Sequence, residues 1–346
     1  MKEYHILIIG GGMCGLASAI ALSQALTPTE SSLSGSPSPL NPLKLRITVY
    51  ELRKEPCTLG GPVNLTPKAL RCLDILGVLD ELKKMKAGCE VDSIEIFSLQ
   101  TGKRLANIDY RGPEGNGFDG YKGWRVMRFH LLQAMLNIIQ RTKNVEIVYG
   151  RKLVAVDEHA DSATVQFEDG TSATGDFVMG CDGIHSAARA KFVQPDRVAS
   201  YSGIAAAYGF TKIADVLDRD EKPFFQDTAL EFSRYGSTLT TFCDHDRSQI
   251  YVVILMSMAS QGSREGWKSI GKDQDAVCAE ARRRTASSAI LQVEKMIVGV
   301  QDWSLYPVYL LPPKGKWHTD RVLLLGDAAH AVWNPTSLRC RHCITA

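Results

Sequence analysis

A glycine-rich turn close to the N-terminus constrains the fold of this chain more than any other feature. Residues 5–9 form a short apolar run typical of a strand, and residues 14–26 have the apolar spacing of a helix. Between them, Gly10, Gly12 and Gly15 follow the pattern GxGxxG. In such a unit the first glycine allows a tight turn, the second lets the backbone approach a pyrophosphate, and the third lets the helix pack against the strand. The turn therefore predicts a Rossmann-type α/β fold that binds a dinucleotide.

The second strand of this unit is predicted to end on the acidic residue that the motif requires. Residues 46–50 form a β-branched strand, and Glu51 follows them. Glu51 lies 36 residues beyond Gly15, but residues 27–44 are rich in Ser and Pro and are predicted to be a mobile surface insertion. Leaving out those 18 residues gives a spacing of 18, close to the roughly 20 of the motif. A carboxylate there binds ribose hydroxyls and repels a 2′-phosphate, which favours FAD or NAD over NADP.

Composition and charge exclude several other classes of protein. The 346 residues, with 45% hydrophobic content, can bury a large core as two domains or as one domain with an inserted sheet. Lys and Arg number 40 against 38 Asp and Glu, and no long basic block occurs, so we expect no nucleic-acid partner. The nine scattered cysteines indicate reduced thiols and a cytoplasmic protein. Residues 6–22 are apolar, but their glycines fall at turn positions and no basic region with a cleavage site frames them, so we expect no membrane span.

The rest of the chain alternates between helix and strand patterns. Thr66-Pro67 begins a helix that Gly77 ends, and residues 128–142 form a second amphipathic helix. Alternating, aromatic segments between residues 201 and 258 predict an antiparallel sheet that forms one wall of a substrate cavity. Further strands are expected at 145–149, 153–158, 163–167, 177–180, 303–311 and 321–325, and further helices at 273–285 and 288–298.

Two motifs downstream each place an acidic residue directly after a predicted strand. The first, CDGIHSAAR at residues 181–189, contains Asp182 and Arg189, and its simplest interpretation is a helix cap and a surface charge. The second, GDAAH, follows the strand at 321–325 and contains Asp327. A capped helix explains this motif too, although the small alanines beside the acid suggest that a ligand approaches closely.

Three motifs in this order, GGGMCG, CDGIHSAAR and RVLLLGDAAH, resemble those of the FAD-dependent aromatic-ring monooxygenases of the para-hydroxybenzoate and salicylate hydroxylase type, especially the fungal members. The segments VYELR, GGPVNLTPKALRCLDILGV and MRFHLL support the resemblance. It implies FAD as cofactor, NADH or NADPH as co-substrate, and O2 as the source of a hydroxyl. It also implies hydroxylation or epoxidation of an aromatic or polyketide-like small molecule, with a role in secondary metabolism.

The resemblance also implies a domain organisation and a set of site residues. Residues 1–200 would form the main part of the FAD-binding domain, 201–310 the substrate domain and 311–335 a return to the FAD-binding domain, leaving 336–346 as an atypical tail. By the same resemblance, Glu51 would bind the adenosine ribose and Arg128 the pyrophosphate or ribityl region. Asp182 would lie near the pyrophosphate and the NAD(P)H path, and Asp327 would accept a hydrogen bond from the ribityl chain. The expected cofactor-binding residues are Gly10, Gly12, Gly15, Glu51, Gly61, Arg128, Asp182, Gly326 and Asp327.

The substrate side is less clearly marked. Many members of the family carry an arginine on the first strand of the substrate sheet, whereas the matching run at 201–210 places Tyr208 there. Tyr208 is the candidate catalytic residue, because its phenol suits a substrate hydroxyl, although a partly buried tyrosine of a sheet is the favoured interpretation of the pattern. Phe232, Tyr235 and Phe242 are further candidates for lining the substrate.

The chain departs from the family after GDAAH. The family continues with a proline, a glycine-rich turn and a helix that faces the flavin, whereas residues 336–346 read TSLRCRHCITA. This tail predicts a truncated gene model or a shifted reading frame, and leaves a non-catalytic flavin-binding paralogue as the alternative function. Cys340 and Cys343 enclose His342, but structural zinc needs four ligands and no second pair follows, so we expect no metal.

Overall fold

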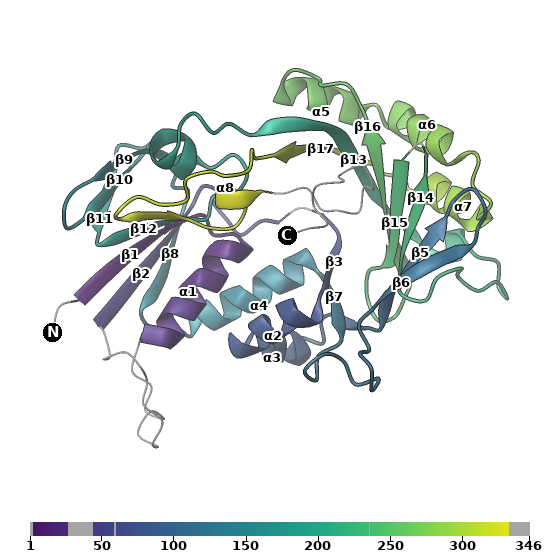
Figure 1. The fold of residues 1–346 in the computed structure, drawn as a ribbon, viewed down its shortest axis with the longest axis horizontal. Coiled ribbons are helices and arrows are strands. Elements are labelled where there is room, and N and C mark those ends of the chain that lie inside the picture. Colours follow the sequence, from purple (N-terminus) through teal and green to yellow (C-terminus); the bar gives the residue numbers. More distant parts are fainter. Residues whose placement is uncertain (1–2, 27–43, 59, 235, 332–346) are drawn as a thin grey trace.

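The chain folds into two halves built on different sheets (Figure 1). The computed structural model describes residues 3–26, 44–58, 60–234 and 236–331. The predicted insertion therefore lies outside the described residues except for Lys44, and so does the tail with its cysteine pair. Within the described part of the chain, no helix is long and apolar enough to cross a membrane.

A five-stranded sheet with the order β18-β12-β1-β2-β8 forms the first half. Every neighbouring pair in it is parallel, as the Rossmann prediction requires. Its strands are β1 (Glu3–Ile9), β2 (Lys44–Glu51), β8 (Val145–Tyr149), β12 (Phe177–Gly180) and β18 (Val322–Leu324). Leu7, Ile8, Ile47 and Val49 have no exposed surface, because parallel strands are covered on both faces.

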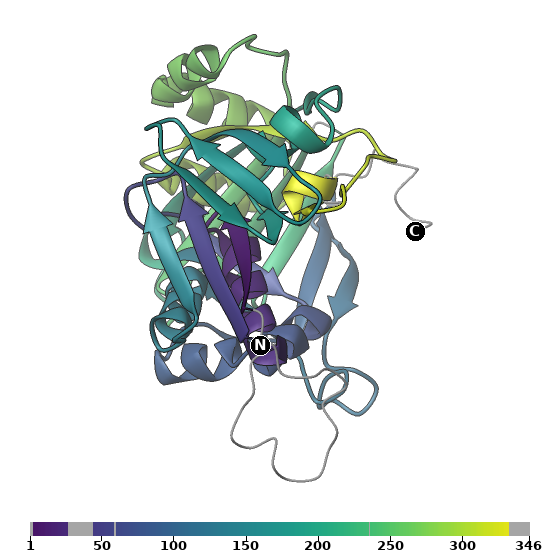
Figure 2. The same cartoon turned by 90° about the vertical axis from the view of Figure 1, so that its left-hand side faces the viewer.

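Two helices, α1 (Met13–Leu26) and α4 (Arg128–Gln140), cover one face of the parallel sheet, and a small antiparallel sheet covers the other. Helix α3 (Val78–Lys84) packs on α4, and α2 (Pro67–Ile75) packs on α3. The Thr66 side chain caps α2 by accepting a hydrogen bond from the backbone N–H of Ala69 at 3.3 Å, as the Thr-Pro pair predicts. On the opposite face, Figure 2 shows β9 (Leu153–Glu158), β10 (Ala163–Phe167) and β11 (Ser172–Gly175) lying across the parallel strands.

The second half is a seven-stranded sheet with the order β17-β13-β16-β15-β14-β5-β6. Its pairs are antiparallel except for β14 with β5, so the predicted α/β class with an antiparallel substrate sheet is confirmed. The strands are β5 (Ser93–Ser98), β6 (Arg104–Asp109), β13 (Ser200–Lys212), β14 (Thr228–Ser233), β15 (Gly236–Phe242), β16 (Gln249–Ser257) and β17 (Ser304–Leu310). β5 and β6 come from the segment assigned to the main FAD-binding part, and the proposed domain division stays a prediction.

Three helices and a third sheet complete the second half. Helices α6 (Gln274–Thr285) and α7 (Leu291–Gly299) pack their apolar side chains on one face of the seven-stranded sheet, while α5 (Arg264–Lys272) lies beside β17. A three-stranded sheet of β3 (Pro62–Leu65), β7 (Gly123–Met127) and β4 (Cys89–Val91) joins the halves. From β7, the buried Arg125 donates a hydrogen bond of 3.1 Å to the backbone carbonyl of Asp227, just before β14. This hydrogen bond connects the sheet that joins the halves to the seven-stranded sheet.

Candidate active site

The glycine turn has the geometry that the sequence predicts. Gly10 has φ +109°, and a side chain there would also collide with the carbonyl oxygen of Cys181. A side chain at Gly15 would collide with the carbonyl oxygen of Gly10, so only glycine lets α1 approach β1 this closely. At Gly12, by contrast, a Cβ would meet no atom within 4 Å. The side of the turn at Gly12, which adjoins the N-terminus of α1, is open to an anionic group.

Glu51 holds this turn in place. Its Oε2 atom accepts a hydrogen bond of 2.7 Å from the backbone N–H of Gly11, and its Oε1 atom accepts one of 2.9 Å from the N–H of Arg53. The backbone N–H of Gly10 donates to the carbonyl of Tyr50 at 2.8 Å, which fixes the turn to the end of β2. The structure thus brings Glu51 to the glycine turn, as the corrected spacing predicts. Its contact with Gly11 was not foreseen.

Asp182 lies against the same turn and caps the segment that follows it. A Cβ on Gly10 would lie 3.0 Å from the Cα atom of Asp182. The Oδ2 atom of Asp182 accepts hydrogen bonds from the backbone N–H groups of Ala187 at 2.7 Å and Ala188 at 3.1 Å. Its Oδ1 atom is buried and finds no hydrogen-bond partner within the described chain. The helix-cap interpretation therefore describes the local geometry.

Arg189 is not the surface charge that the simplest interpretation makes it. Only 2% of the residue is exposed, and its guanidinium donates to the carbonyls of Ala328 at 2.8 Å and Ile184 at 2.6 Å. Arg197, 7% exposed, donates in the same way to the carbonyl of Ala329 at 2.7 Å. Sequence reasoning missed this pair, because a single arginine shows no sign of a partner 139 residues away. The Arg189 guanidinium therefore joins the CDGIHSAAR and GDAAH motifs, and that of Arg197 binds the second motif.

Asp327 is exposed at the start of α8 (Asp327–His330). Its carboxylate makes no hydrogen bond and no ion pair with any residue that the structure describes, so both oxygens are free to accept. Gly326 before it has φ +57°, and a Cβ there would lie 2.9 Å from the Sγ atom of Cys14 in the first turn of α1. The GDAAH motif and the glycine turn are therefore neighbours in space.

Two cysteine thiols meet between these motifs. Cys14 and Cys181 are hydrogen bonded side chain to side chain, and this bond lowers the pKa of Cys14 to about 7 against the opposing effect of burial. The same contact, together with burial, raises the pKa of Cys181. The sequence places these cysteines 167 residues apart and carries no signal of their contact. Cys14 is thus the acidic thiol of the pair.

Arg128 is the first residue of α4 and lies at the junction between the two halves. A Cβ on Gly60 would lie 3.4 Å from its Cδ and Nε atoms. Its guanidinium has no hydrogen-bond or ion-pair partner among the residues described, which leaves it free for an anionic group. A side chain at Gly61 would collide with the ring of Tyr251, so the start of β3 packs directly on the seven-stranded sheet.

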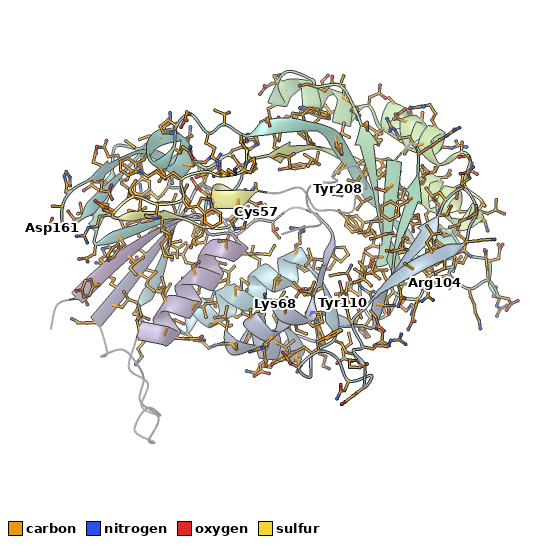
Figure 3. All side chains as sticks on the ribbon, in the orientation of Figure 1. Cys57, Lys68, Arg104, Tyr110, Asp161 and Tyr208 are labelled. Atoms are coloured by element: carbon orange, nitrogen blue, oxygen red, sulfur yellow. The ribbon has the colours of Figure 1, made fainter. Side chains whose placement is uncertain are left out.

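Aromatic side chains of that sheet face the same junction. The ring of Tyr251 lies 5.7 Å from that of Tyr208 and 5.2 Å from that of Phe210, centroid to centroid. Burial raises the pKa of Tyr251 to about 12. Figure 3 marks the half-buried Tyr208 near the middle of the molecule, where the two halves come together. Tyr306, which the sequence does not single out, is exposed at its edge strand, and the partial loss of hydration and then the charge of Asp327 raise its pKa.

The remaining lining candidates divide between the two faces of the sheet. Phe232 pairs with Ser237 and is half-buried. Phe242 has no exposed surface and stacks on Phe225 at 4.9 Å, inside the core beneath α6 and α7, so its assignment as a lining residue is wrong. The alternation of a strand shows two faces without showing which one the helices cover. Tyr235 lies outside the described residues.

The comparisons with known proteins match this arrangement. The family model for the FAD binding domain matches residues 3–337. The chain belongs to this FAD-binding family. The predicted family of aromatic-ring monooxygenases, the FAD cofactor and the class of FAD-dependent oxidoreductase are thereby confirmed.

Individual relatives are distant but cover most of the chain. An FAD-dependent monooxygenase of a Nectria species is 23% identical over 348 residues, 95% of this chain and 71% of the relative. A putative FAD-dependent monooxygenase of Bacillus subtilis is 26% identical over 331 residues, 94% of this chain and 78% of the relative. The crystal structure of Klebsiella pneumoniae HpxO with FAD and uric acid superposes with a TM-score of 0.73 at 24% identity, over 96% of this chain and 74% of the other. This last likeness shows the fold.

Proposed function

We propose that this protein is a monooxygenase that uses FAD, NADH or NADPH, and O2 to hydroxylate or epoxidise an aromatic or polyketide-like small molecule, as a step of secondary metabolism. In the hydroxylation, one oxygen atom of O2 enters the ring and the other leaves as water. The two electrons that this requires come from the nicotinamide, which ends as NAD(P)+.

A single observation carries the proposal. Glu51 is the last residue of β2, Asp182 lies two residues after the end of β12, and Asp327 lies three residues after the end of β18. Because these strands are parallel, their carboxyl ends share one edge of the sheet. In open α/β sheets this is the edge at which nucleotides bind. The tyrosines of the seven-stranded sheet face the same region, so a cofactor extended along the edge would present its far end to them.

The residues along this edge fit the parts of FAD. The open side of Gly12 at the N-terminus of α1 suits the pyrophosphate, and Glu51 suits the adenosine ribose, since sugar hydroxyls donate strongly to carboxylates. The free guanidinium of Arg128 suits the pyrophosphate or the ribityl region, and the free carboxylate of Asp327 suits a ribityl hydroxyl. Without side chains, Gly61 near Arg128 and Gly326 before Asp327 let the cofactor approach the backbone closely. Asp182 supports the glycine turn.

When bound, the flavin supplies the transfer of electrons and the activation of O2. The protein then has to bind the ring, orient it and exclude water from the reacting atoms. We assign Tyr208 to orienting the substrate, because its half-buried phenol lies among the aromatic rings of the junction. A hydrogen bond from a substrate hydroxyl to the phenol oxygen would hold the ring in one orientation. No acid and base pair is needed for this role.

Two further lines support the aromatic substrate and the location. Relatives at 24% identity are named for aromatic rings, among them a 6-hydroxynicotinate 3-monooxygenase of Pseudomonas fluorescens and a 3-amino-4-hydroxybenzoate 2-monooxygenase of Streptomyces platensis. The seven cysteines of the described residues are free thiols, which is what a reducing cytoplasm favours. We place the enzyme there.

Purified protein distinguishes this function from that of a non-catalytic flavin-binding paralogue. The enzyme is expected to bind one FAD per chain and to oxidise NADH or NADPH at a rate that an aromatic ligand stimulates, with ¹⁸O from ¹⁸O2 appearing in the product. Protein that binds FAD but shows neither ligand-stimulated oxidation nor ¹⁸O incorporation over a broad panel of phenols would identify the paralogue instead.

A further inference from the structure

One face of the seven-stranded sheet carries no charged side chain along its central rows. The register places seven residues in a straight line across seven strands, and directly paired residues point to the same face. This Tyr208 row consists of Ser304, Tyr208, Val253, Leu239, Leu230, Ile96 and Ala106. Every member except Ser304 is aliphatic or aromatic, and the only polar atoms among these side chains are the hydroxyl oxygens of Ser304 and Tyr208.

The rows on either side continue the pattern. One contains Tyr306, Ala206, Leu255, Ser237, Phe232 and Ser98. The other contains Phe210, Tyr251, Thr241 and Thr228. We call these three rows together the phenol face. Their polar groups are all hydroxyls, which donate and accept hydrogen bonds but carry no charge.

The opposite face of the same sheet differs. There Ala207 pairs with Ile254, Ile254 with Thr238, and Thr238 with Glu231. Glu231 is buried and accepts hydrogen bonds from the hydroxyls of Thr238 and Thr240, the latter at 2.5 Å. This face lies beneath α6 and α7. The described sheet therefore holds a carboxyl group on its helix-covered face but presents none on the phenol face.

The phenol face is turned toward the proposed flavin site. Tyr251 packs against Gly61, and Tyr306 lies close enough to Asp327 and Tyr208 for both to raise its pKa, after burial. Tyr208, Val253 and Leu239 are all partly exposed, whereas Ala207 and Ile254 on the helix side have at most 1% exposed. A ligand held between the flavin and the sheet would therefore contact this face.

Among the described residues, the cations that act on the tyrosines of the phenol face come from outside the sheet. Arg128, at the start of α4, acts on Tyr251, and Arg264, at the start of α5, acts on Tyr306. Neither belongs to a strand of the sheet. We assign Arg128 to FAD, so a carboxylate set against the Tyr208 row would lose its water without gaining a counter-ion from that row, which is strongly unfavourable. A neutral ring would bury apolar surface against Val253 and Leu239 and stack with the tyrosines.

We propose that the phenol face binds an uncharged aromatic ring through apolar contacts and one hydroxyl–phenol hydrogen bond to Tyr208, and that it rejects rings that carry a carboxylate. This inference rests on the proposed monooxygenase function and narrows its substrate class. It separates this chain from the relatives named for 6-hydroxynicotinate and 3-amino-4-hydroxybenzoate, whose names contain a carboxylate.

Ligand binding to the FAD-loaded protein tests the inference. The probes are 2-naphthol and 3-hydroxy-2-naphthoate, which share ring and hydroxyl and differ by the carboxylate, and their Kd is read from the change in flavin absorbance. We expect 2-naphthol to bind at least tenfold more tightly. Equal or tighter binding of the carboxylate, or no binding of either probe, would overturn the inference.

Two variants locate the preference on the phenol face. Tyr208→Phe should weaken 2-naphthol roughly fivefold to tenfold and leave naphthalene unchanged, since naphthalene has no hydroxyl. Val253→Arg should reverse the preference in favour of the carboxylate. Val154→Arg, the same substitution at a position of β9 that is 37% exposed, is the control and should change neither Kd. If Val253→Arg no longer binds FAD, the Kd values of Tyr208→Phe for 2-naphthol and naphthalene alone test whether the preference lies on the phenol face.

Failure of this inference is distinguishable from failure of the proposed function. If the carboxylate and the alcohol stimulate NADH or NADPH oxidation equally, the monooxygenase stands and the neutral substrate class falls. If 2-naphthol binds selectively but no ligand of the panel stimulates oxidation, the binding preference stands and the monooxygenase falls.

Discussion

Replacing Glu51 by Gln tests whether this carboxylate builds the cofactor site. The two carboxylate oxygens accept backbone N–H groups, Gly11 at 2.7 Å and Arg53 at 2.9 Å. The amide of glutamine keeps one acceptor and turns an NH2 group toward the second N–H, so one bond to a charged group is lost. Such a bond contributes ~1.5–3 kcal/mol, and part of this loss falls on the turn that binds FAD.

The expected result is that the Kd for FAD rises on the order of tenfold, which corresponds to about 1.4 kcal/mol. Quenching of flavin fluorescence on binding measures this Kd, and thermal unfolding of the apoprotein shows that the variant is folded. Glu55→Gln is the matched control, because Glu55 is an exposed acid of the same loop and should leave the Kd unchanged. A folded Glu51→Gln variant with a Kd within twofold of the wild type would refute the reasoning.

Three further predictions concern groups around the site and beneath it. Because the Cys181 contact lowers the pKa of Cys14 to about 7, alkylation of Cys14 by iodoacetamide should accelerate up to about pH 7 and then level off. Peptide mass spectrometry measures this rate against pH, and the same midpoint of the rate profile in Cys181→Ala would contradict the prediction. Burial raises the pKa of Glu231 from 4.5 to about 7, so the native state keeps a proton that the unfolded chain releases. The free energy of unfolding should therefore fall by up to ~1.4 kcal/mol per pH unit as the pH rises between these values. Urea unfolding at several pH values should show this slope in the wild type and not in Glu231→Gln. Equal slopes in both proteins would contradict the buried, protonated state of Glu231. Arg189→Met leaves the buried carbonyl of Ala328 and the partly buried carbonyl of Ile184 without donors. With the lost charge-assisted bonds, this should cost about 3 kcal/mol of stability, at ~1–3 kcal/mol for each unpaired group. Arg282→Met, at an exposed position, is the control for the unfolding measurement, and equal losses in both variants would count against the buried role.

The parallel sheet and the glycine turn could be predicted because their signals are local. The strand at 5–9, the helix at 14–26 and the turn between them occupy consecutive residues, and each glycine has a steric reason that its neighbours reveal. Glu51 could be found because removing one insertion restored its spacing. Helix caps such as Thr66 are equally local.

The parts that escaped prediction depend on contacts between distant segments. The burial of Arg189 is set by carbonyls 139 residues away, and the Cys14–Cys181 contact by the meeting of α1 with the end of β12. Phe242 was assigned to the wrong face, because alternation in β15 shows that two faces exist without showing which one α6 and α7 cover. The phenol face likewise emerges only once the strand register is known.

The most direct measurement of the central claim is the structure of the FAD-bound protein. We predict one FAD along the carboxyl edge of the parallel sheet, with the pyrophosphate at Gly12, the adenosine ribose at Glu51, a ribityl hydroxyl at Asp327 and the flavin ring opposite Tyr208. FAD bound elsewhere, or a flavin ring turned away from the seven-stranded sheet, would contradict the account.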